Sequence, residues 1–174
     1  PYATVTWASH VDPETGRPVV TEGARYEDKP TGLQLPGPIG GHNWHPMSYH
    51  PEHGLVYIPR QDVGWVYATD EEFEHRPGYW NTGTDSRPAA LPDDPATKAA
   101  VLGTVRGTIV AWDPVAMAPR WEVEHAGPWN GGMLSTGGNL LFQGNAEGEL
   151  VAYRADSGEA LWSFDAQTGI VAPP

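Results

Sequence analysis

The sequence of 174 residues contains no cysteine, so it carries neither a disulfide framework nor a thiol nucleophile. It has no run of about 18 apolar residues, so we expect no segment that spans a membrane. Basic residues are scarce: 10 Lys and Arg stand against 22 Asp and Glu, which gives a formal net charge of −12. Nucleic acids and anionic membranes attract basic patches, so this balance argues against either as a partner.

Glycine and proline are abundant, at 21 and 18 residues, which is typical of a fold with many tight turns. Two stretches of alternating apolar residues repeat at a fixed offset. Gly107 matches Gly148 and Trp121 matches Trp162, and the offset is the same in both cases (148 − 107 = 162 − 121). A repeat of this length with a tryptophan at a fixed position predicts β-propeller blades.

A second repeat relates two pairs of strands at a longer constant offset. Trp44 through Pro59 parallels Trp129 through Gly144 (129 − 44 = 144 − 59), and each stretch reads as two strands joined by a glycine-containing turn. The two repeats together predict two whole blades of four antiparallel strands, at about 44–125 and 131–165. The expected strands are 44–50, 54–60, 107–113 and 119–125 in the first blade, and 131–136, 140–144, 148–154 and 160–165 in the second.

An insertion at about 61–104 separates the second and third strands of the first blade, with at most a short helical piece near 96–100. The leading residues, about 1–27, are typical of the second half of a preceding blade. We therefore expect an all-β fold over 1–174, a partial β-propeller that cannot close a ring, since closure needs at least four blades. The chain begins without Met or a signal-like segment, so we expect it to be a piece of a longer protein.

Trp121 and Trp162 are expected to be buried between neighbouring blades, because a tryptophan at a fixed blade position buries a large apolar face. Ala111 and Ala152 leave room for the rings. The pairs Asn43-Trp44 and Trp129-Asn130 differ, since they fall at the starts of innermost strands, which line the central funnel of a propeller. They are either structural pairs between blades or a ligand site, and their occurrence on two blades favours the ligand site.

Four histidines form an H-x-x-H…H-x-x-H pattern that on a helix would indicate a metal site. Glycines and prolines interrupt the stretch, and residues three apart on a strand face opposite ways. We therefore expect solvent-facing turn histidines and no metal site in this chain. No pair of acidic residues has a spacing that marks it as catalytic. The four histidines are His42, His45, His50 and His53.

Three stretches, 36–49, 54–59 and 111–174, resemble the pyrroloquinoline-quinone (PQQ)-dependent, or quinoprotein, alcohol dehydrogenases, which are eight-bladed, tryptophan-docked propellers of the bacterial periplasm. The resemblance implies that the chain is a set of late blades of such an enzyme. It implies that Asn43 and Trp44 contact the edge of the quinone, that Trp129 lies close by, and that Val171 approaches it through its backbone.

The same resemblance implies that no catalytic residue and no metal ligand lies in this chain. The calcium ligands, the aspartate base, the tryptophan floor and a vicinal disulfide of the family belong to earlier blades. The implied partners are a small alcohol, the rest of the propeller and an electron acceptor such as a cytochrome c. Arg154 replaces the usual Asp of the docking motif, so this blade contact is expected to be altered.

Two alternative functions fit a propeller repeat. One is a non-catalytic scaffold that binds proteins, and the other is a carbohydrate-handling propeller, suggested by the eight tryptophans and the many acids. The scaffold needs no polar groups at the funnel, so the pairs Asn43-Trp44 and Trp129-Asn130 favour the dehydrogenase. The carbohydrate hypothesis predicts exposed tryptophan faces in a groove, whereas Trp121 and Trp162 have docking positions.

Overall fold

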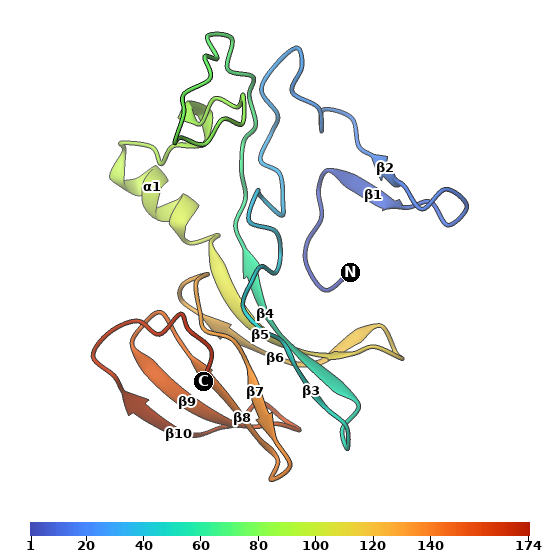
Figure 1. Cartoon of the computed structure of the whole chain (residues 1–174), viewed down its shortest axis with the longest axis vertical. Helices are drawn as coiled ribbons and strands as arrows, with labels where there is room; N and C mark the ends of the chain where they lie inside the picture. Colours follow the sequence, from blue (N-terminus) through green and yellow to red (C-terminus); the bar gives the residue numbers. More distant parts are fainter.

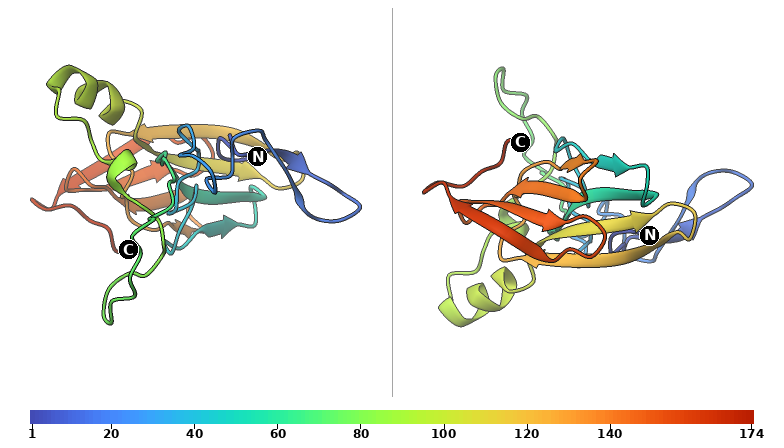
Figure 2. Two further views of the ribbon diagram at one scale, coloured as in Figure 1. Left: turned by 90° about the horizontal axis from the view of Figure 1, so that it is seen from above. Right: turned by 90° about the horizontal axis from the view of Figure 1, so that it is seen from below.

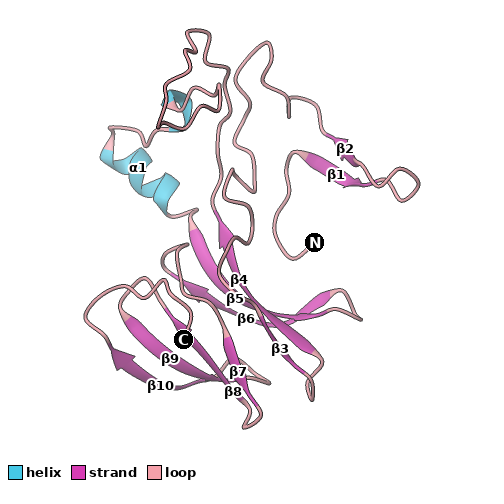
Figure 3. Ribbon diagram, in the orientation of Figure 1, coloured by secondary structure: helices cyan, strands magenta, loops and turns pink.

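The computed structural model describes residues 1–174, and strands and loops make up most of it (Figure 3). The strands are β1 Ala8–Val11, β2 Pro18–Val20, β3 Ser48–His50, β4 Leu55–Asp62, β5 Arg106–Asp113, β6 Ala118–His125, β7 Leu134–Thr136, β8 Leu140–Gly144, β9 Glu149–Arg154 and β10 Ala160–Asp165. The helical elements are a 3₁₀ helix η1 at Arg87–Ala89 and an α-helix α1 at Pro95–Leu102. No helix is both long enough and apolar enough to cross a membrane.

Two four-stranded antiparallel sheets, β3-β4-β5-β6 and β7-β8-β9-β10, form two blades of a partial propeller (Figure 1). The predicted strand order is confirmed, and β1 and β2 pair as a separate hairpin. The innermost strands are shorter than predicted. Pro46 has no N–H for a ladder, and the backbone of Gly131 and Gly132 packs tightly against other segments.

The turn between the first two strands is one residue shorter in the second blade. Ser48 pairs with Tyr57, and Leu134 pairs with Phe142. The second strands are therefore related by the predicted offset (142 − 57 = 129 − 44), whereas the offset between the first strands (134 − 48) is larger by one. Trp44 and Trp129 consequently precede their strands by four and five residues, so the predicted equivalence of these two positions is wrong by one residue.

The hydrophobic core lies between the two blades. Figure 2 shows the sheet of β7–β10 lying against the sheet of β3–β6. Strand β5 supplies its central residues, because Ile109 and Ala111 alternate onto the face that meets the second blade and are fully buried. The core residues are Leu55, Tyr57, Ile109 and Ala111 from the first blade, and Met133, Leu141, Val151, Tyr153 and Ala155 from the second.

Trp121 docks across this seam as predicted and is partly buried there. Its Nε1 donates to the carbonyl oxygen of Ala155 at 3.1 Å, and its ring lies 5.6 Å from the ring of Tyr57. The indole sits directly over Gly158, where a Cβ atom would come within 2.7 Å of it. Position 158, on which the indole docks, therefore requires glycine.

Trp162 does not follow the prediction in this chain, since it is 52 % exposed. It lies on the edge strand β10, all six residues of which are exposed, and it stacks on Phe164 at 6.2 Å. The physical reason is the absence of a further sheet against β10, so the apolar face that Trp121 buries in the first blade stays open in the second.

The replacement of Asp by Arg154 changes how the docking turn is stabilised. Asp113, which holds the equivalent position in the first blade (154 − 113 = 148 − 107), accepts hydrogen bonds from the N–H groups of Val115 and Ala116, both at 2.9 Å. Arg154 instead forms an ion pair with Glu159 at 3.0 Å. The next carbonyl, that of Ala155, still accepts from Trp121, so the contact between the blades is kept with a different local support.

The N-terminal segment and the insertion lie together beyond one end of the sheets (Figure 1). Gln34 and Trp65 exchange backbone hydrogen bonds at 2.8 and 2.9 Å, and Tyr26 stacks on Tyr67 at 5.7 Å. The predicted helical piece is confirmed as α1, whose N-cap Asp94 accepts from the N–H of Thr97 at 2.8 Å. None of the residues of α1 is buried.

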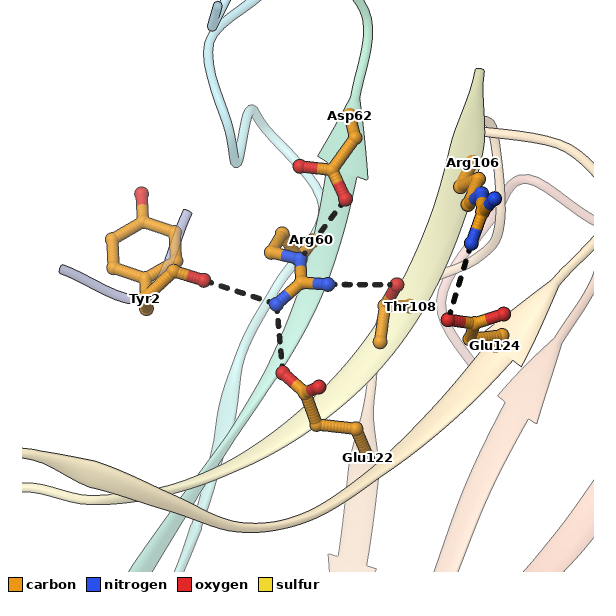
Figure 4. A network of polar contacts seen from close by, with 7 residues as sticks. All are labelled: Tyr2, Arg60, Asp62, Arg106, Thr108, Glu122 and Glu124. Carbon is orange, nitrogen blue, oxygen red and sulfur yellow. Dashed lines mark hydrogen bonds and ion pairs between the residues drawn. The ribbon is translucent and has the colours of Figure 1, made fainter. Parts of the chain in front are cut away.

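Arg60 ties the N-terminal segment to the first blade, as Figure 4 shows. Its guanidinium donates to Glu122 at 2.7 Å, to the hydroxyl of Thr108 at 3.2 Å and to the carbonyl oxygen of Tyr2 at 3.2 Å. Nε lies 3.3 Å from Asp62, close enough for an ion pair but not aligned as a hydrogen bond. The side chain is only 17 % exposed, so this pairing is more strongly coupled than one at the surface.

Candidate cofactor-binding site

The antiparallel order determines which segments meet at one end of the blades. Strand β3 begins where β4 ends, where β5 begins and where β6 ends. The residues before β3, the insertion between β4 and β5, and the connection from β6 to β7 therefore lie at the same end. Trp44 and Trp129, which precede β3 and β7, are brought together there.

Three aromatic rings form a stack across the seam between the blades. The ring of His45 lies 4.2 Å from that of Trp44, nearly parallel at 26°, and 5.5 Å from that of Trp129, edge-on at 63°. His45 is only 3 % exposed, whereas Trp44 is 58 % and Trp129 39 % exposed. The histidine is therefore a buried ring in contact with two partly exposed indoles.

The expectation of solvent-facing histidines is wrong for His45 and His50, which are both buried. Burial lowers the pKa of His45, and the neighbouring His42 lowers it further. The neutral form is therefore favoured, and its Nε2 has no hydrogen-bond partner. The sequence signal that was missed is the position of His45 between a tryptophan and a proline at the start of an innermost strand.

The four histidines do not converge on one point. His50 stacks on His53 at 4.2 Å at the far end of β3, where their Nε2 atoms lie 3.0 Å from the carbonyl oxygen of Thr136 and 2.8 Å from Oδ1 of Asn139. No group of three or more His, Asp or Glu side chains is arranged to hold a metal ion. His50 and His53 instead join the hairpin turns of the two blades.

Asn43 holds the loop that presents Trp44. Its Nδ2 donates to the carbonyl oxygen of Ile39 at 2.8 Å, and its Oδ1 accepts from the N–H of Trp44 at 2.8 Å. The side chain is exposed, and an amide has two donor hydrogens and two acceptor lone pairs. One of each is used locally, so one donor and one acceptor site stay available to a ligand beside Trp44.

Asn130 has a structural role and does not line the funnel as predicted. It is 4 % exposed, donates from Nδ2 to the carbonyl oxygen of Gly127 at 2.8 Å, and accepts from the N–H of Ala146 at 3.1 Å. These bonds fix the connection between β6 and β7. Of the two Asn-Trp pairs, only Asn43 presents a polar side chain at the surface.

The backbone of the last residues passes over the start of the second blade. The N–H of Ile170 donates to the carbonyl oxygen of Asn145 at 2.9 Å. A Cβ on Gly131 would lie 2.6 Å from the carbonyl oxygen of Ala172, so only glycine admits this approach. The half-buried Val171 lies between Ile170 and Ala172, two residues that are held close to the connection carrying Trp129.

The residues present fit a flat, polar-edged cofactor. The two partly exposed indoles offer apolar surface. The unused donor and acceptor of the Asn43 amide, together with nearby backbone groups, offer hydrogen bonds. None of these side chains is a carboxylate or a nucleophile. The arrangement can therefore bind and orient a ring system, whereas proton transfer needs groups from elsewhere.

A separate cleft of about 890 Å³ lies in the insertion and the segment packed on it. Acidic side chains line it together with Arg87, which forms an ion pair with Asp85. Trp80, which is 95 % exposed, is also among its lining residues. The carbohydrate hypothesis predicts exposed tryptophans in a groove, and Trp80 is one such residue. Trp44 and Trp129 do not line this cleft.

The chain is similar to several alcohol dehydrogenases of the quinone-dependent type. The alcohol dehydrogenase (quinone), dehydrogenase subunit, of Gluconacetobacter polyoxogenes is 48 % identical over 99 % of this chain and 24 % of its own length. The quinohemoprotein alcohol dehydrogenase ADHIIG of Pseudomonas putida HK5 superposes with a TM-score of 0.88 at 36 % identity, over 98 % of this chain and 25 % of that one. The quinohemoprotein alcohol dehydrogenase of Comamonas testosteroni superposes with a TM-score of 0.82 at 43 % identity, over 98 % of this chain and 25 % of that one.

A family model described as outer membrane protein assembly factor BamB matches residues 105–174. Nearly all of the chain aligns with the alcohol dehydrogenases, but it spans only about a quarter of their length. The resemblance to quinoprotein alcohol dehydrogenases and the partial propeller predicted from the sequence are confirmed.

Proposed function

We propose that the chain contributes two late blades, and one wall of the PQQ site, to a periplasmic quinoprotein dehydrogenase that oxidises a small alcohol. The observation that carries this proposal is the stack of Trp44, His45 and Trp129, which joins the two blades at one end and leaves two indoles exposed. Similarity over 99 % of the chain to an alcohol dehydrogenase (quinone) supports it. The hairpin within residues 1–27 would then belong to the preceding blade.

Each proposed binding residue has a distinct task. Trp44 and Trp129 provide apolar surface beside the ring system, Asn43 donates to or accepts from its edge, and the backbone near Val171 completes that side. When bound, PQQ supplies the two-electron acceptor for alcohol oxidation. This chain's own residues bind it, orient it and exclude water from one side of it.

The remaining parts of the reaction are assigned to the rest of the propeller. A calcium ion, its ligands and the base that takes the hydroxyl proton of the alcohol would come from other blades, and an electron acceptor such as a cytochrome c would reoxidise the cofactor. The exposed apolar edge at Trp162 would pack against the next blade. We accordingly expect the 174 residues alone, supplied with PQQ and calcium, to give no alcohol-dependent turnover.

The scaffold alternative draws support from the match of residues 105–174 to a family model named for an outer membrane assembly factor. That match covers the repeat of β5 to β10 but not Asn43, Trp44 or His45. The quinone-dependent relatives cover these residues as well. The dehydrogenase therefore accounts for more of the chain than the scaffold does.

A PQQ titration of the apo form of the full-length protein that carries these residues tests the proposal. Wild type should bind PQQ, and Asn43→Ala should bind it about 1–3 kcal/mol more weakly, the cost of leaving a buried polar partner unsatisfied. Asn81→Ala is the matched control. Asn81 also holds an exposed loop, donating to the carbonyl oxygens of Arg76 and Tyr79 at 2.9 and 2.7 Å, but it lies in the insertion. Absence of PQQ binding by wild type would refute the proposed function.

A further inference from the structure

We propose that His45 is a positioning residue for the cofactor: its flat ring, and not its hydrogen-bonding capacity, sets the orientation of Trp44 and Trp129. This inference rests on the proposed function and deepens it. His45 would not touch the cofactor, because it is 3 % exposed and its Nε2 is inaccessible. It would act through the two indoles that lie on it.

The geometry of the rings is the first support. Trp44 stacks on His45 with an interplanar angle of 26°, while Trp129 meets the same ring edge-on at 63°. Aromatic pairs prefer offset-stacked and edge-to-face arrangements, so both contacts are favourable ones. One buried ring thus contacts two indoles in different orientations, on segments that come from different blades.

The Nε2 atom of His45 provides the second support. Nε2 is buried without a hydrogen-bond partner, and an unsatisfied buried polar atom weakens folding. Burial also lowers the pKa of this imidazole, so a charge is not what the site maintains. The feature of the side chain that the structure uses is its planar shape.

The residue after His45, Pro46, is held in place, which limits how far the backbone can move to fill the site of the ring. The carbonyl oxygen of Pro46 accepts from the N–H of Met133 at 2.9 Å, and the ring of Pro46 packs so closely on Gly132 that a Cβ there would lie 2.5 Å away. Removing the ring of His45 would therefore leave a gap directly beneath both indoles, and the indoles would lose their common support.

The test compares His45→Ala with His45→Phe in the full-length protein that carries these residues. The apo protein is titrated with PQQ, and near-ultraviolet circular dichroism reports the tryptophan environment before PQQ is added. We expect His45→Ala to weaken PQQ binding roughly tenfold, since two aromatic contacts are lost, and to change the dichroism. His45→Phe keeps the flat ring and should bind PQQ within about threefold of wild type, with the dichroism largely restored.

His50→Ala is the matched control, because His50 is 2 % exposed and stacks on His53 at the same 4.2 Å, but at the other end of β3. It should lower stability without changing PQQ affinity. If His45→Ala does not fold, His45→Leu replaces it, since leucine fills the volume without a flat face, and Leu should bind more weakly than Phe.

Wild-type binding together with equal affinities of the Ala or Leu variant and wild type would overturn the positioning role and leave the proposed function standing. A Phe variant as weak as Ala would overturn it too, because the nitrogens would then matter. Absence of PQQ binding by wild type would remove the proposed function and this inference with it.

Discussion

The indole Nε1 of Trp121 donates to the carbonyl oxygen of Ala155 at 3.1 Å, and this hydrogen bond joins the outermost strand of one blade to a turn of the next. The same carbonyl oxygen accepts from the hydroxyl of Tyr57 at 2.8 Å, and burial raises the pKa of that tyrosine to about 12. One backbone oxygen thus receives two aromatic side chains from the first blade. Substitutions at this seam, and at the segments attached to it, should therefore change stability measurably.

Trp121→Ala should lower the free energy of unfolding of the full-length protein by roughly 3–5 kcal/mol, the range for deleting a buried aromatic side chain. Trp121→Phe should lose less, about 1 kcal/mol for the hydrogen bond to Ala155 plus some packing. Urea denaturation measures both. If Trp121→Ala changed the midpoint by a negligible amount, the docking contact would have no energetic role.

Gly158→Ala should destabilise the full-length protein by about 1–3 kcal/mol, because the new methyl group would lie 2.7 Å from the ring of Trp121 and because φ at this position is +76°. Gly54→Ala is the control for backbone strain alone, since φ is +64° there but no atom lies within 4 Å of the added Cβ. A comparison of denaturation midpoints separates the two contributions. Equal losses would mean that the contact with Trp121 contributes nothing.

Acidification should weaken the seam through His125, which is 9 % exposed at the end of β6. Its Nε2 lies 2.9 Å from Oε1 of Gln143, whose Nε2 donates to the carbonyl oxygen of Gly131 at 2.8 Å. Because that carbonyl only accepts, the amide orientation is fixed and Nε2 of His125 carries the proton. Burial lowers the pKa of His125, while the bond to Gln143 and the charge of Glu147 offset part of this effect.

The sign of the pH dependence follows from these shifts. A lowered pKa in the folded state means that the unfolded chain binds the proton more readily, and the pKa of His45 is lowered as well. Stability from both histidines should be complete above about pH 6.5 and lost as the pH falls through their folded-state pKa values. His125→Gln should show a shallower loss of stability than wild type as the pH falls below about 6.5 in denaturation experiments. A slope identical to that of wild type would contradict the prediction.

Arg60→Met should loosen the N-terminal segment and lower stability by about 1–3 kcal/mol, because Glu122, Asp62 and the carbonyl oxygen of Tyr2 lose a charged partner. Arg106→Met is the matched control. The pair of Arg106 with Glu124 spans 3.4 Å and is more than half exposed, so its loss should stay within about 0.5 kcal/mol. Limited proteolysis near residue 2 and urea denaturation measure the difference, and equal behaviour of the two variants would show that the network has no anchoring role.

Repeat spacing in the sequence was sufficient to locate the eight strands of the two blades, their antiparallel order, the insertion with its short helix, and the docking of Trp121. This worked because blade strands pair with their neighbours in the chain, so local alternation and turn residues carry most of the information. Asn43, Trp44 and Trp129 were selected in the same way, as polar and aromatic residues at the starts of innermost strands, and their role in binding a cofactor stays a prediction.

Tertiary packing alone decided which of those residues face outward. Asn130 and Asn43 look alike in the sequence, and each donates one hydrogen bond and accepts one, yet Asn130 is buried while Asn43 is exposed. His45 is buried because two blades close on it, and Trp162 is exposed because no sheet covers β10. Burial of a side chain depends on which distant segments pack against it, and the spacing of repeats in the sequence does not specify those contacts.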